Sequence, residues 1–540
     1  MDIIAPLKMF TGNIGENTLI VAFRGNQLNQ EPEPEPIETK PTEPAKPICA
    51  DKMTETDTTK VADDQSQTDE PKKDEGKGVI YPQIIATLVV NLVLLSCGLC
   101  YAWPTVSLLK YQKPDSPIKM KPEEESWVVT AVPLGAIVGP LSAALLVDRI
   151  GRKWFIHLLF LPSLIGWILI YLAKDWVLLL VGRLFCGIPT GAAFAVIPQY
   201  LGEIVETRKR GAANFMMVIF LNAGYILMYG VGPLVNQQML AIICTIPPIL
   251  LFLLVPWLPE SPYHCLKKNN AENAELSLIW LRRNINNKDK IDEIKEFIER
   301  EKDGGLKKLF AKPVHRKALY IMLLLLAGQQ LSGIVAIQSY AGVIIRNINV
   351  DVSIHLILLG LGACSLVFGI ITSVIIDRVG RKPLYLFSAY TTVLCLAAMG
   401  TYYLLEEMRF NVKPYAAVPV AILILFYLAV TVGVTSIPAV VSGEIFPISV
   451  KIWASSIINT YGAALALLVS KSYQPILDAF GLKTVFYIFA LVELIIATAS
   501  IFIMPETAKK SFSEIQDELN RSIIARQHSD EELVTEEVPA

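Results

Sequence analysis

Long apolar runs alternate with short polar connections from about residue 80 to residue 504 of the 540-residue chain. A helix needs roughly 20 apolar residues to cross about 30 Å of hydrocarbon at 1.5 Å per residue. We expect twelve such helices, at residues 80–108, 126–147, 155–173, 177–200, 212–233, 239–257, 318–345, 353–376, 384–404, 417–442, 453–473 and 484–504. The pattern therefore predicts an all-α membrane protein with twelve transmembrane helices.

Polar segments divide these runs into two sets of six. Residues 1–78 are polar and Pro-rich, which predicts a disordered cytoplasmic tail. No cleaved signal peptide is expected, because the first long apolar run begins only near Val79 and is too long for one. The other predicted parts are a bundle at 79–257, a cytoplasmic helical linker at 258–317, a second bundle at 318–504 and a cytoplasmic tail at 505–540.

The distribution of Lys and Arg predicts the orientation. Most of these residues lie in the connections that share a side with both termini, so the positive-inside rule places both ends in the cytosol. The connection at 109–125 is an exception with four Lys, which Asp115, Glu123, Glu124 and Glu125 offset. We expect a multi-pass plasma-membrane protein with the lipid bilayer as its surroundings.

Composition supports this picture and excludes other classes of protein. Only 18% of residues are charged and the mean hydropathy is +0.46, whereas soluble chains carry about a quarter charged residues. The net charge of -2 gives no indication of nucleic acid binding. Eight scattered cysteines form neither a disulfide framework nor a zinc site, and no phosphate loop or nucleophile elbow is present. We expect no enzyme activity, no metal and no cofactor.

An internal duplication is the strongest signal in the sequence. Asp148-Arg149-Ile150-Gly151-Arg152-Lys153 follows the second apolar run, and Asp377-Arg378-Val379-Gly380-Arg381-Lys382 follows the eighth. Two further pairs repeat at equivalent places: Glu203 with Arg210 and Glu444 with Lys451, and Pro259-Glu260-Ser261 and Pro505-Glu506-Thr507. The repeats predict two homologous halves of six helices. Acidic and basic residues at helix ends can form a gate that clamps the halves together; the alternative is that they only mark topology in solvated loops.

Uncharged polar residues inside the predicted seventh and tenth helices are candidates for binding a solute. Amides and hydroxyls replace the water around a polar solute without ionising, and the candidates are Gln329, Gln330, Gln338, Tyr340 and Ser436. Gln338 and Tyr340 lie about 200° apart on an unbroken helix, unless Gly333 breaks it. For each residue the alternative is a hydrogen bond between helices. Gly135, Gly139, Gly187 and Gly191 have the spacing of close helix packing.

With these residues in hand, the chain resembles the sugar porter family of the major facilitator superfamily, and most closely its insect facilitated trehalose transporter-like members. The resemblance covers about residues 80–507 and rests on both Asp-Arg-x-Gly-Arg-Lys loops, Gly182-Arg183, and the segments 198–203, 259–262, 329–334 and 505–507. It implies the major facilitator fold, with the solute held between two rocking halves. It also implies sugar-binding roles for Gln329 and Gln330 and a cytoplasmic gate of Asp148, Arg149, Arg152, Glu203, Arg210, Asp377, Arg378, Arg381 and Glu444.

The sequence departs from the family pattern in the predicted pocket. Val335 stands where an Asn is expected, Ala439 replaces an aromatic residue, and Val218 replaces a Gln. Tyr263 replaces an arginine, and Gly462-Ala463 replace an Asn-Trp pair. These losses imply either a different substrate, such as a larger disaccharide, or a shift towards sensing.

The placement of acidic residues bears on energy coupling. The first predicted helix has no Asp or Glu, and Ala102 aligns with the Asp of proton-coupled relatives. Glu493 in the twelfth helix is the one acid deep in a predicted span, with either a coupling role or a neutral structural one. We therefore expect facilitated (uniport) transport of a sugar, trehalose or a hexose, by alternating access. The alternatives are a proton-coupled symporter and a non-transporting sugar receptor whose N-terminal tail binds a cytosolic partner.

Overall fold

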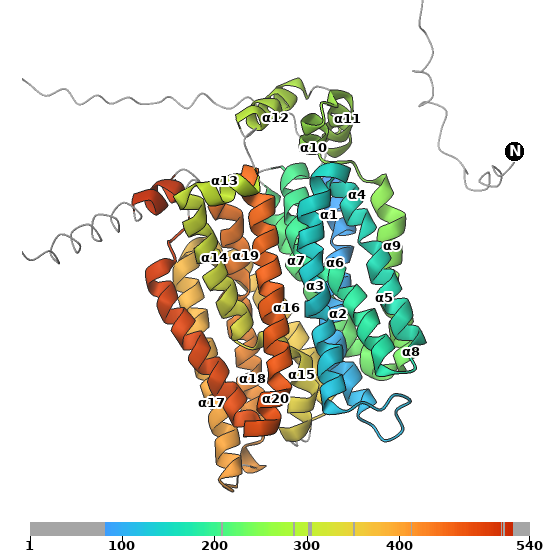
Figure 1. Cartoon of the computed structure of the whole chain (residues 1–540), viewed down its shortest axis with the longest axis vertical. Coiled ribbons are helices and arrows are strands. Elements are labelled where there is room, and N and C mark those ends of the chain that lie inside the picture. The colour runs from blue at the N-terminus through green and yellow to red at the C-terminus, as the bar shows by residue number, and fades with distance from the viewer. Residues whose placement is uncertain are drawn as a thin grey trace, which may run out of the picture. The chain divides into compact units, whose positions relative to one another are not determined.

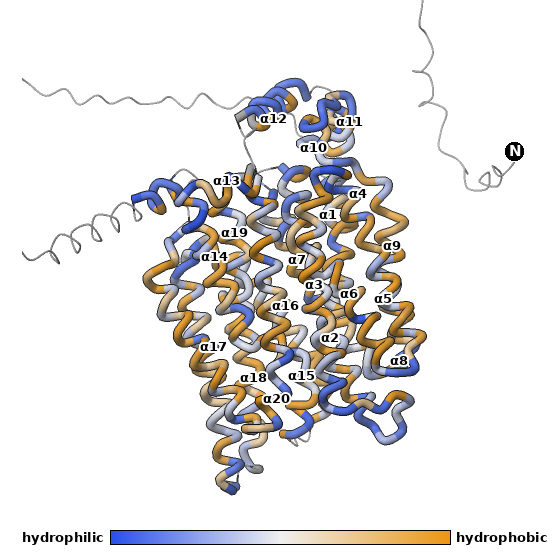
Figure 2. Tube along the Cα trace, viewed as in Figure 1, coloured by the Kyte–Doolittle hydropathy of each residue, from blue (hydrophilic) through white to orange (hydrophobic). Residues whose placement is uncertain are grey.

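The computed structural model describes residues 81–206, 209–284, 287–300, 305–348, 352–411, 413–508, 510 and 514–521. The predicted N-terminal tail and most of the predicted C-terminal tail lie outside these residues. The regular elements of the described part are all helices. Figure 1 shows the long helices side by side, and Figure 2 shows that their middles are apolar while their ends and the connecting segment α10–α12 are polar.

The first half contains six apolar crossings. Their bounds are α1 (Tyr81–Val90) with α2 (Leu92–Tyr111), α3 (Pro122–Ile150), α4 (Arg152–Leu158) with α5 (Phe160–Leu172), α6 (Trp176–Ile204), α7 (Arg210–Val231) with η2 (Gly232–Leu234), and α8 (Gln237–Cys244) with α9 (Ile246–Leu254) and η3 (Val255–Trp257). The linker then forms α10 (Pro262–Lys267), α11 (Ala271–Arg282), α12 (Lys288–Arg300) and α13 (Leu306–Ala311).

The second half repeats this arrangement. Its elements are α14 (Pro313–Leu331) with α15 (Ile334–Ile348), α16 (Ile354–Val379), α17 (Arg381–Glu407), η4 (Lys413–Tyr415), α18 (Ala417–Ala429) with the π-turn η5 (Val430–Val434) and α19 (Ser436–Ile445), and α20 (Ile448–Ile503).

The number of crossings agrees with the sequence prediction. Eleven helical segments of the described chain are long and apolar enough to cross a membrane, and the last of them, Val450–Ile503, has 54 residues. Gly481 interrupts that segment with φ 77° and ψ 171°, so it contains two helices. The prediction of twelve membrane helices is therefore confirmed for the described residues, with bounds that differ from those predicted by a few positions.

Close packing within and between the halves follows the small residues. In the first half α3 packs against α6, where a Cβ on Gly135 would lie 2.1 Å from the carbonyl oxygen of Leu184. The close packing predicted from the glycine spacing is confirmed there. The two halves meet where α3 contacts α20, α2 contacts α15 and α7 contacts α16.

The seventh crossing is broken at Gly333, an alternative that the sequence left open. Gly333 has φ 80°, between the end of α14 at Leu331 and the start of α15 at Ile334. This left-handed conformation costs glycine little because it has no Cβ. The break sets the direction of α15 independently of α14.

Candidate functional site

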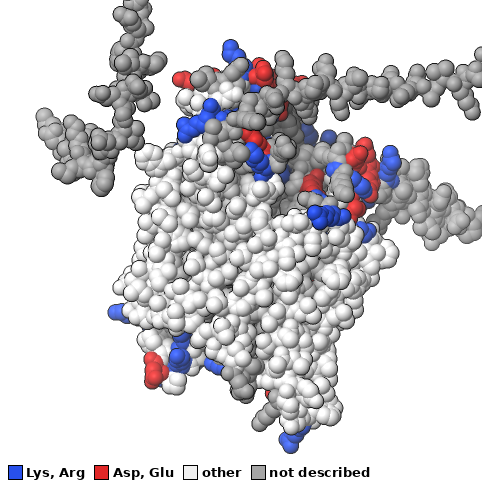
Figure 3. All heavy atoms as spheres, turned by 180° about the vertical axis from the view of Figure 1, so that it is seen from behind, with Lys and Arg blue, Asp and Glu red and all other residues white. Residues whose placement is uncertain are grey.

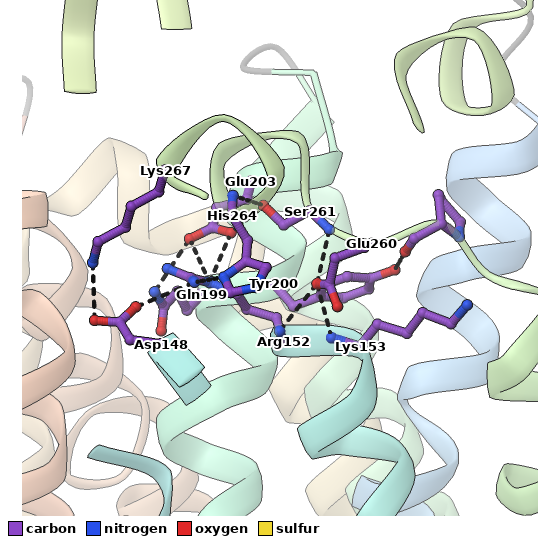
Figure 4. A network of polar contacts seen from close by, with 11 residues as sticks. Asp148, Arg152, Lys153, Gln199, Tyr200, Glu203, Glu260, Ser261, His264 and Lys267 are labelled. Carbon is purple, nitrogen blue, oxygen red and sulfur yellow. Dashed lines mark hydrogen bonds and ion pairs between the residues drawn. The ribbon is translucent and has the colours of Figure 1, made fainter. Parts of the chain in front are cut away.

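Charged residues of the described chain gather at the end of the bundle where α3 ends and α4 begins, which we call the charged end (Figure 3). Arg152, at the start of α4, is only 5% exposed. Its Nη1 lies 3.2 Å from Asp148 Oδ1 and its Nε lies 3.1 Å from Glu203 Oε2. These pairs tie the ends of α3, α4 and α6 together (Figure 4).

A tight glycine turn brings a second carboxylate to the same place. Gly151 has φ 99°, and the backbone N–H groups of Arg152 and Lys153 donate to Glu260 Oε1 at 3.0 and 3.1 Å. A Cβ on Gly151 would lie 2.3 Å from Glu260 Oε2. The carboxylate thus satisfies free N–H groups at the start of α4, where the helix dipole favours negative charge.

The linker contributes three side chains to this group. The Ser261 hydroxyl donates to Glu203, Arg152 Nη1 donates to His264 Nδ1 at 2.9 Å, and Lys267 Nζ lies 3.0 Å from Asp148 Oδ2. Figure 4 shows these side chains turned towards Arg152 and its partners. We call this group, with Gln199 donating to Glu203 at 3.2 Å, the N-half network.

Two groups of the N-half network outside the membrane spans have shifted pKa values. Burial raises the pKa of Glu260, against the lowering effect of the N–H donors of Ser261 and Lys153 and of the Arg152 charge. Burial, together with the nearby charge of Arg152, lowers the pKa of His264 from 6.5 to about 4. A neutral His264 is consistent with its Nδ1 accepting a hydrogen bond from arginine.

The second half repeats the geometry with its own residues. Arg381, 7% exposed, places Nη2 2.8 Å from Glu444 Oε1, and Thr507 Oγ1 donates to Glu444 Oε2 at 2.7 Å. The N–H groups of Arg381 and Lys382 each donate to Glu506 at 3.0 Å, beside Gly380 with φ 102°. Burial opposes ionisation of Glu506, but backbone N–H donors outweigh it and its pKa lies below the usual value. We call this group the C-half network.

The networks join some of the predicted gate residues and leave others out. Arg149 and Arg378 are exposed, and Arg210 Nε donates to the Val205 carbonyl at 3.3 Å. The side chain of Asp377 lies outside the described part of the structure. Each network draws its ion pairs from one half and the segment that follows it. Lys451 of α20, in the second half, lies near Arg210 and Glu203, and its Nζ donates to the Gly443 carbonyl at 3.2 Å.

Residues that the gate prediction omitted complete both networks. They are Glu260, Ser261, His264 and Lys267 after the sixth crossing and Glu506 and Thr507 after the twelfth. The repeated Pro-Glu-Ser and Pro-Glu-Thr segments carried the signal for four of them. Nothing in the sequence pattern indicated His264 or Lys267.

The candidate sugar-binding glutamines lie on either side of the Gly333 break. Gln329 and Gln330 end α14, and the Oε1 atom of Gln330 is buried without a hydrogen-bond partner among the described residues. Its Nε2 lies 3.8 Å from where a Cβ on Gly462 would be. A buried amide oxygen without a partner favours a bound donor, such as a hydroxyl.

On α15, Gln338 and Tyr340 have different neighbours. The backbone carbonyl of Gln338 accepts a 2.6 Å hydrogen bond from Thr105, and its side chain lies near the hydroxyls of Tyr225 and Tyr229 of α7. Tyr340 instead stacks on Tyr473, with ring centroids 4.6 Å apart. The structure therefore does not bring Tyr340 together with Gln338.

The tenth crossing supplies one predicted residue and one that was missed. The Ser436 hydroxyl donates to the Thr431 carbonyl at 2.6 Å, which satisfies a backbone group freed by the π-turn η5. Tyr427 of α18, with a buried hydroxyl that has no hydrogen-bond partner in the described part, lies near Tyr225 and Tyr229. These three tyrosines and Gln338 form a polar cluster between the halves, which we call the tyrosine cluster.

A buried arginine lies beside the first crossing. Arg183 of α6 is 1% exposed, and its Nη1 donates to the Cys100 carbonyl at 2.6 Å. Its guanidinium also lies 4.9 Å from the centre of the Trp103 ring. The positive charge is therefore balanced by a carbonyl dipole and an aromatic face.

Comparison with known proteins identifies similar chains. The profile of the family described as "Sugar (and other) transporter" matches residues 101–519. The facilitated trehalose transporter Tret1 of Bombyx mori is 30% identical over 444 residues, which cover 82% of this chain and 87% of the relative. Tret1 of Apis mellifera ligustica is 28% identical over 443 residues, covering 80% and 87%.

Solved structures with the same arrangement of helices include the proton:xylose symporter XylE. XylE bound to 6-bromo-6-deoxy-D-glucose has a TM-score of 0.67 at 20% identity, covering 81% of this chain and 99% of that one. The partially occluded inward-open XylE of E. coli has a TM-score of 0.66 at 18% identity, covering 80% and 100%. At this identity the likeness shows the fold alone, and it confirms the predicted major facilitator architecture.

Proposed function

The chain belongs to the sugar (and other) transporter family, and from this premise we propose that it moves a sugar across the plasma membrane by facilitated diffusion. Family membership makes it a multi-pass membrane sugar transporter and not an enzyme. The mechanism, the substrate and the orientation in the membrane are our proposals.

The surroundings of Arg183 are the main support for facilitated diffusion over proton-coupled transport. Coupling to protons needs a group whose proton affinity differs between the two access states. The first crossing, α1 with α2, offers Arg183 the Cys100 carbonyl and the Trp103 ring, and it contains no Asp or Glu. The Cys100 thiol also lies 3.5 Å from Arg183 Nη1, but the first crossing places no carboxylate beside the arginine that could bind and release a proton during transport.

Trehalose is the first substrate to test, with a hexose as the second. The named function of the insect relatives supports trehalose. The unpartnered Gln330 oxygen and the tyrosine cluster support a ligand with many hydroxyls, since amides and phenols both donate and accept hydrogen bonds. Several pocket positions that are polar in the family are apolar in this chain. Contacts with the hydroxyls of a sugar therefore fall to Gln330 and the tyrosine cluster.

The two networks support a gate of rigid halves that rock against each other. Ion pairs within each half bind its helix ends together, and only the interface between the halves then has to change. Lys451 of the second half lies near both Arg210 and Glu203 of the first half, so charges of the two halves face each other across that interface. We place this end in the cytosol, with both termini, because Lys and Arg are concentrated there.

Uptake into proteoliposomes tests the proposal directly. We expect labelled trehalose, or failing that glucose, to equilibrate across the membrane without being concentrated, with or without an imposed proton gradient. Accumulation that depends on the gradient would establish the symporter instead. Saturable binding of the sugar without uptake would establish the receptor.

A further inference from the structure

Glu493, in the twelfth crossing, is completely buried. Its exposed fraction is 0%, and neither carboxyl oxygen has a hydrogen-bond partner among the described residues. The side chain therefore points into the bundle and not towards lipid. The mechanism proposed above gives this residue no task.

The surroundings of Glu493 connect it to the seventh crossing. A Cβ on Gly328 of α14 would lie 2.5 Å from the Tyr385 hydroxyl, 3.1 Å from Ile496 Cγ2 and 3.6 Å from Glu493 Oε2. The Tyr385 hydroxyl of α17 is likewise buried without a hydrogen-bond partner in the described part of the chain. The absence of a side chain at Gly328 leaves room for these two polar groups against the backbone of α14.

Burial without a partner determines the form of the carboxyl group. An ionised carboxylate away from water costs many kcal/mol unless a cation or several donors stabilise it. Tyr385 is a titratable neighbour of Glu493, and its hydroxyl also lies near Ser500. Among the described residues no Lys, Arg or His forms an ion pair with Glu493. The neutral acid can be buried here, because an uncharged carboxyl group loses far less hydration free energy than a carboxylate.

Sequence position then links the pair to the substrate. Gly328 immediately precedes Gln329 and Gln330, so whatever fixes the backbone at Gly328 also fixes the start of the candidate binding segment. We propose that Glu493 is carried as a neutral carboxylic acid that, together with Tyr385, positions Gln329 and Gln330 for the sugar. The proposal rests on the proposed sugar transport and requires no net proton movement.

The first test measures the protonation of Glu493 without transport. Infrared difference spectra of the purified full-length protein, wild type against Glu493→Gln, are recorded at neutral pH. We expect a protonated carboxyl band in the wild type that is missing in the variant. Lack of that band would overturn the proposal, whatever the protein transports.

The second test measures positioning through transport. We expect Glu493→Ala and Tyr385→Phe to raise the half-saturating sugar concentration several-fold with less effect on the maximal rate, and Glu493→Gln to restore it. In a Gln330→Ala background, Glu493→Ala should add little, because the contact that it positions is already gone. Independent, multiplicative losses would show that Glu493 acts elsewhere.

The pH profile separates positioning from mere packing. Wild-type transport should fall as alkaline pH removes the proton from Glu493, while Glu493→Gln keeps a flatter profile. Glu407→Gln, which alters an exposed ion pair with Lys483 in the same half, is the matched control and should follow the wild type. Parallel profiles for wild type and Glu493→Gln would contradict the proposal.

A wild-type protein that transports no sugar would refute the proposed function, and the infrared measurement would still decide the state of Glu493.

Discussion

Each buried arginine at the charged end holds two glutamates in two different ways. The guanidinium of Arg152 binds Glu203 while its backbone N–H binds Glu260, and Arg381 does the same with Glu444 and Glu506. One residue thus joins three segments that are distant in sequence. A lysine at either position would keep the backbone contact but would lack the planar guanidinium with its several N–H donors.

His264 makes the stability of the fold depend on pH. The described part of the C-half network contains no equivalent histidine. Its folded pKa, about 4, is below its ordinary 6.5, so the unfolded chain binds the proton more strongly. The stability that neutral His264 provides is present above about pH 6.5 and is lost as the pH falls towards 4. We expect a loss on the order of 1–3 kcal/mol over this range, because each pKa unit corresponds to about 1.4 kcal/mol.

Thermal unfolding of the purified protein between pH 7.5 and about pH 4 measures this term. His264→Gln keeps an acceptor for Arg152 but cannot titrate, so its stability should decline less than that of the wild type over the acidic range. Equal slopes in His264→Gln and the wild type would show that His264 does not contribute.

Gln330 tests the candidate binding site. If its unpartnered oxygen accepts a hydrogen bond from the sugar, Gln330→Ala should cost roughly 1–3 kcal/mol, which is about a five- to hundredfold loss of affinity. Equilibrium binding and uptake kinetics, at equal surface expression, measure the loss. Gln474→Ala, whose side chain bonds Asp478 within the same helix, is the control. Unchanged affinity in Gln330→Ala would remove the residue from the site.

At the scale of single elements, the break at Gly333 sets how the side chains of α15 are turned relative to those of α14. We expect Gly333→Ala to destabilise the fold strongly, because φ 80° disfavours a Cβ and that atom would lie 2.3 Å from Phe489. Gly360→Ala adds a Cβ where no atom lies within 4 Å and is the matched control. Thermal unfolding in detergent should separate the two variants, and a stable Gly333→Ala would mean that the break is not required.

The elements themselves could be predicted from the sequence, but many contacts of the site could not. Apolar runs fixed the twelve crossings because lipid requires a continuous helix, and Gly333 marked the break. The repeated Pro-Glu segments indicated Glu260 and Glu506 as equivalents. His264 and Lys267 could not be predicted, because their contacts depend on how α10 folds back onto α4, and Tyr340 could not be placed, because the direction of α15 follows from tertiary packing.

At the scale of the whole molecule, polar contacts join the halves at the end opposite the charged end. Arg346 of α15 donates to Gln112 Oε1 at 2.7 Å, and Gln112 donates to Glu125 at 2.8 Å. Lys471 Nζ of α20 lies 3.9 Å from the centre of the Trp127 ring of α3. We call these the far-end contacts. Because the Arg346–Gln112 and Lys471–Trp127 contacts cross the interface, any opening of this end has to break them.

Removing the far-end contacts should therefore shift the balance between access states, because a conformational equilibrium responds to interactions present in one state only. We expect Arg346→Ala with Lys471→Ala to favour opening at the far end by about 1 kcal/mol, roughly a fivefold change in the population ratio. Lys451→Ala removes a half-buried charge at the charged end whose repulsion from Arg210 outweighs its attraction to Glu203, so it should stabilise closure of that end and favour the same change. Distances between spin labels at the exposed positions Asp115 and Tyr415, one in each half, report both shifts.

Lys483→Ala breaks an ion pair with Glu407 inside one half and should leave the distribution unchanged, since that contact does not cross the interface. If all four proteins, including the wild type, gave the same distances, the halves would be held together by apolar packing and not by these polar contacts.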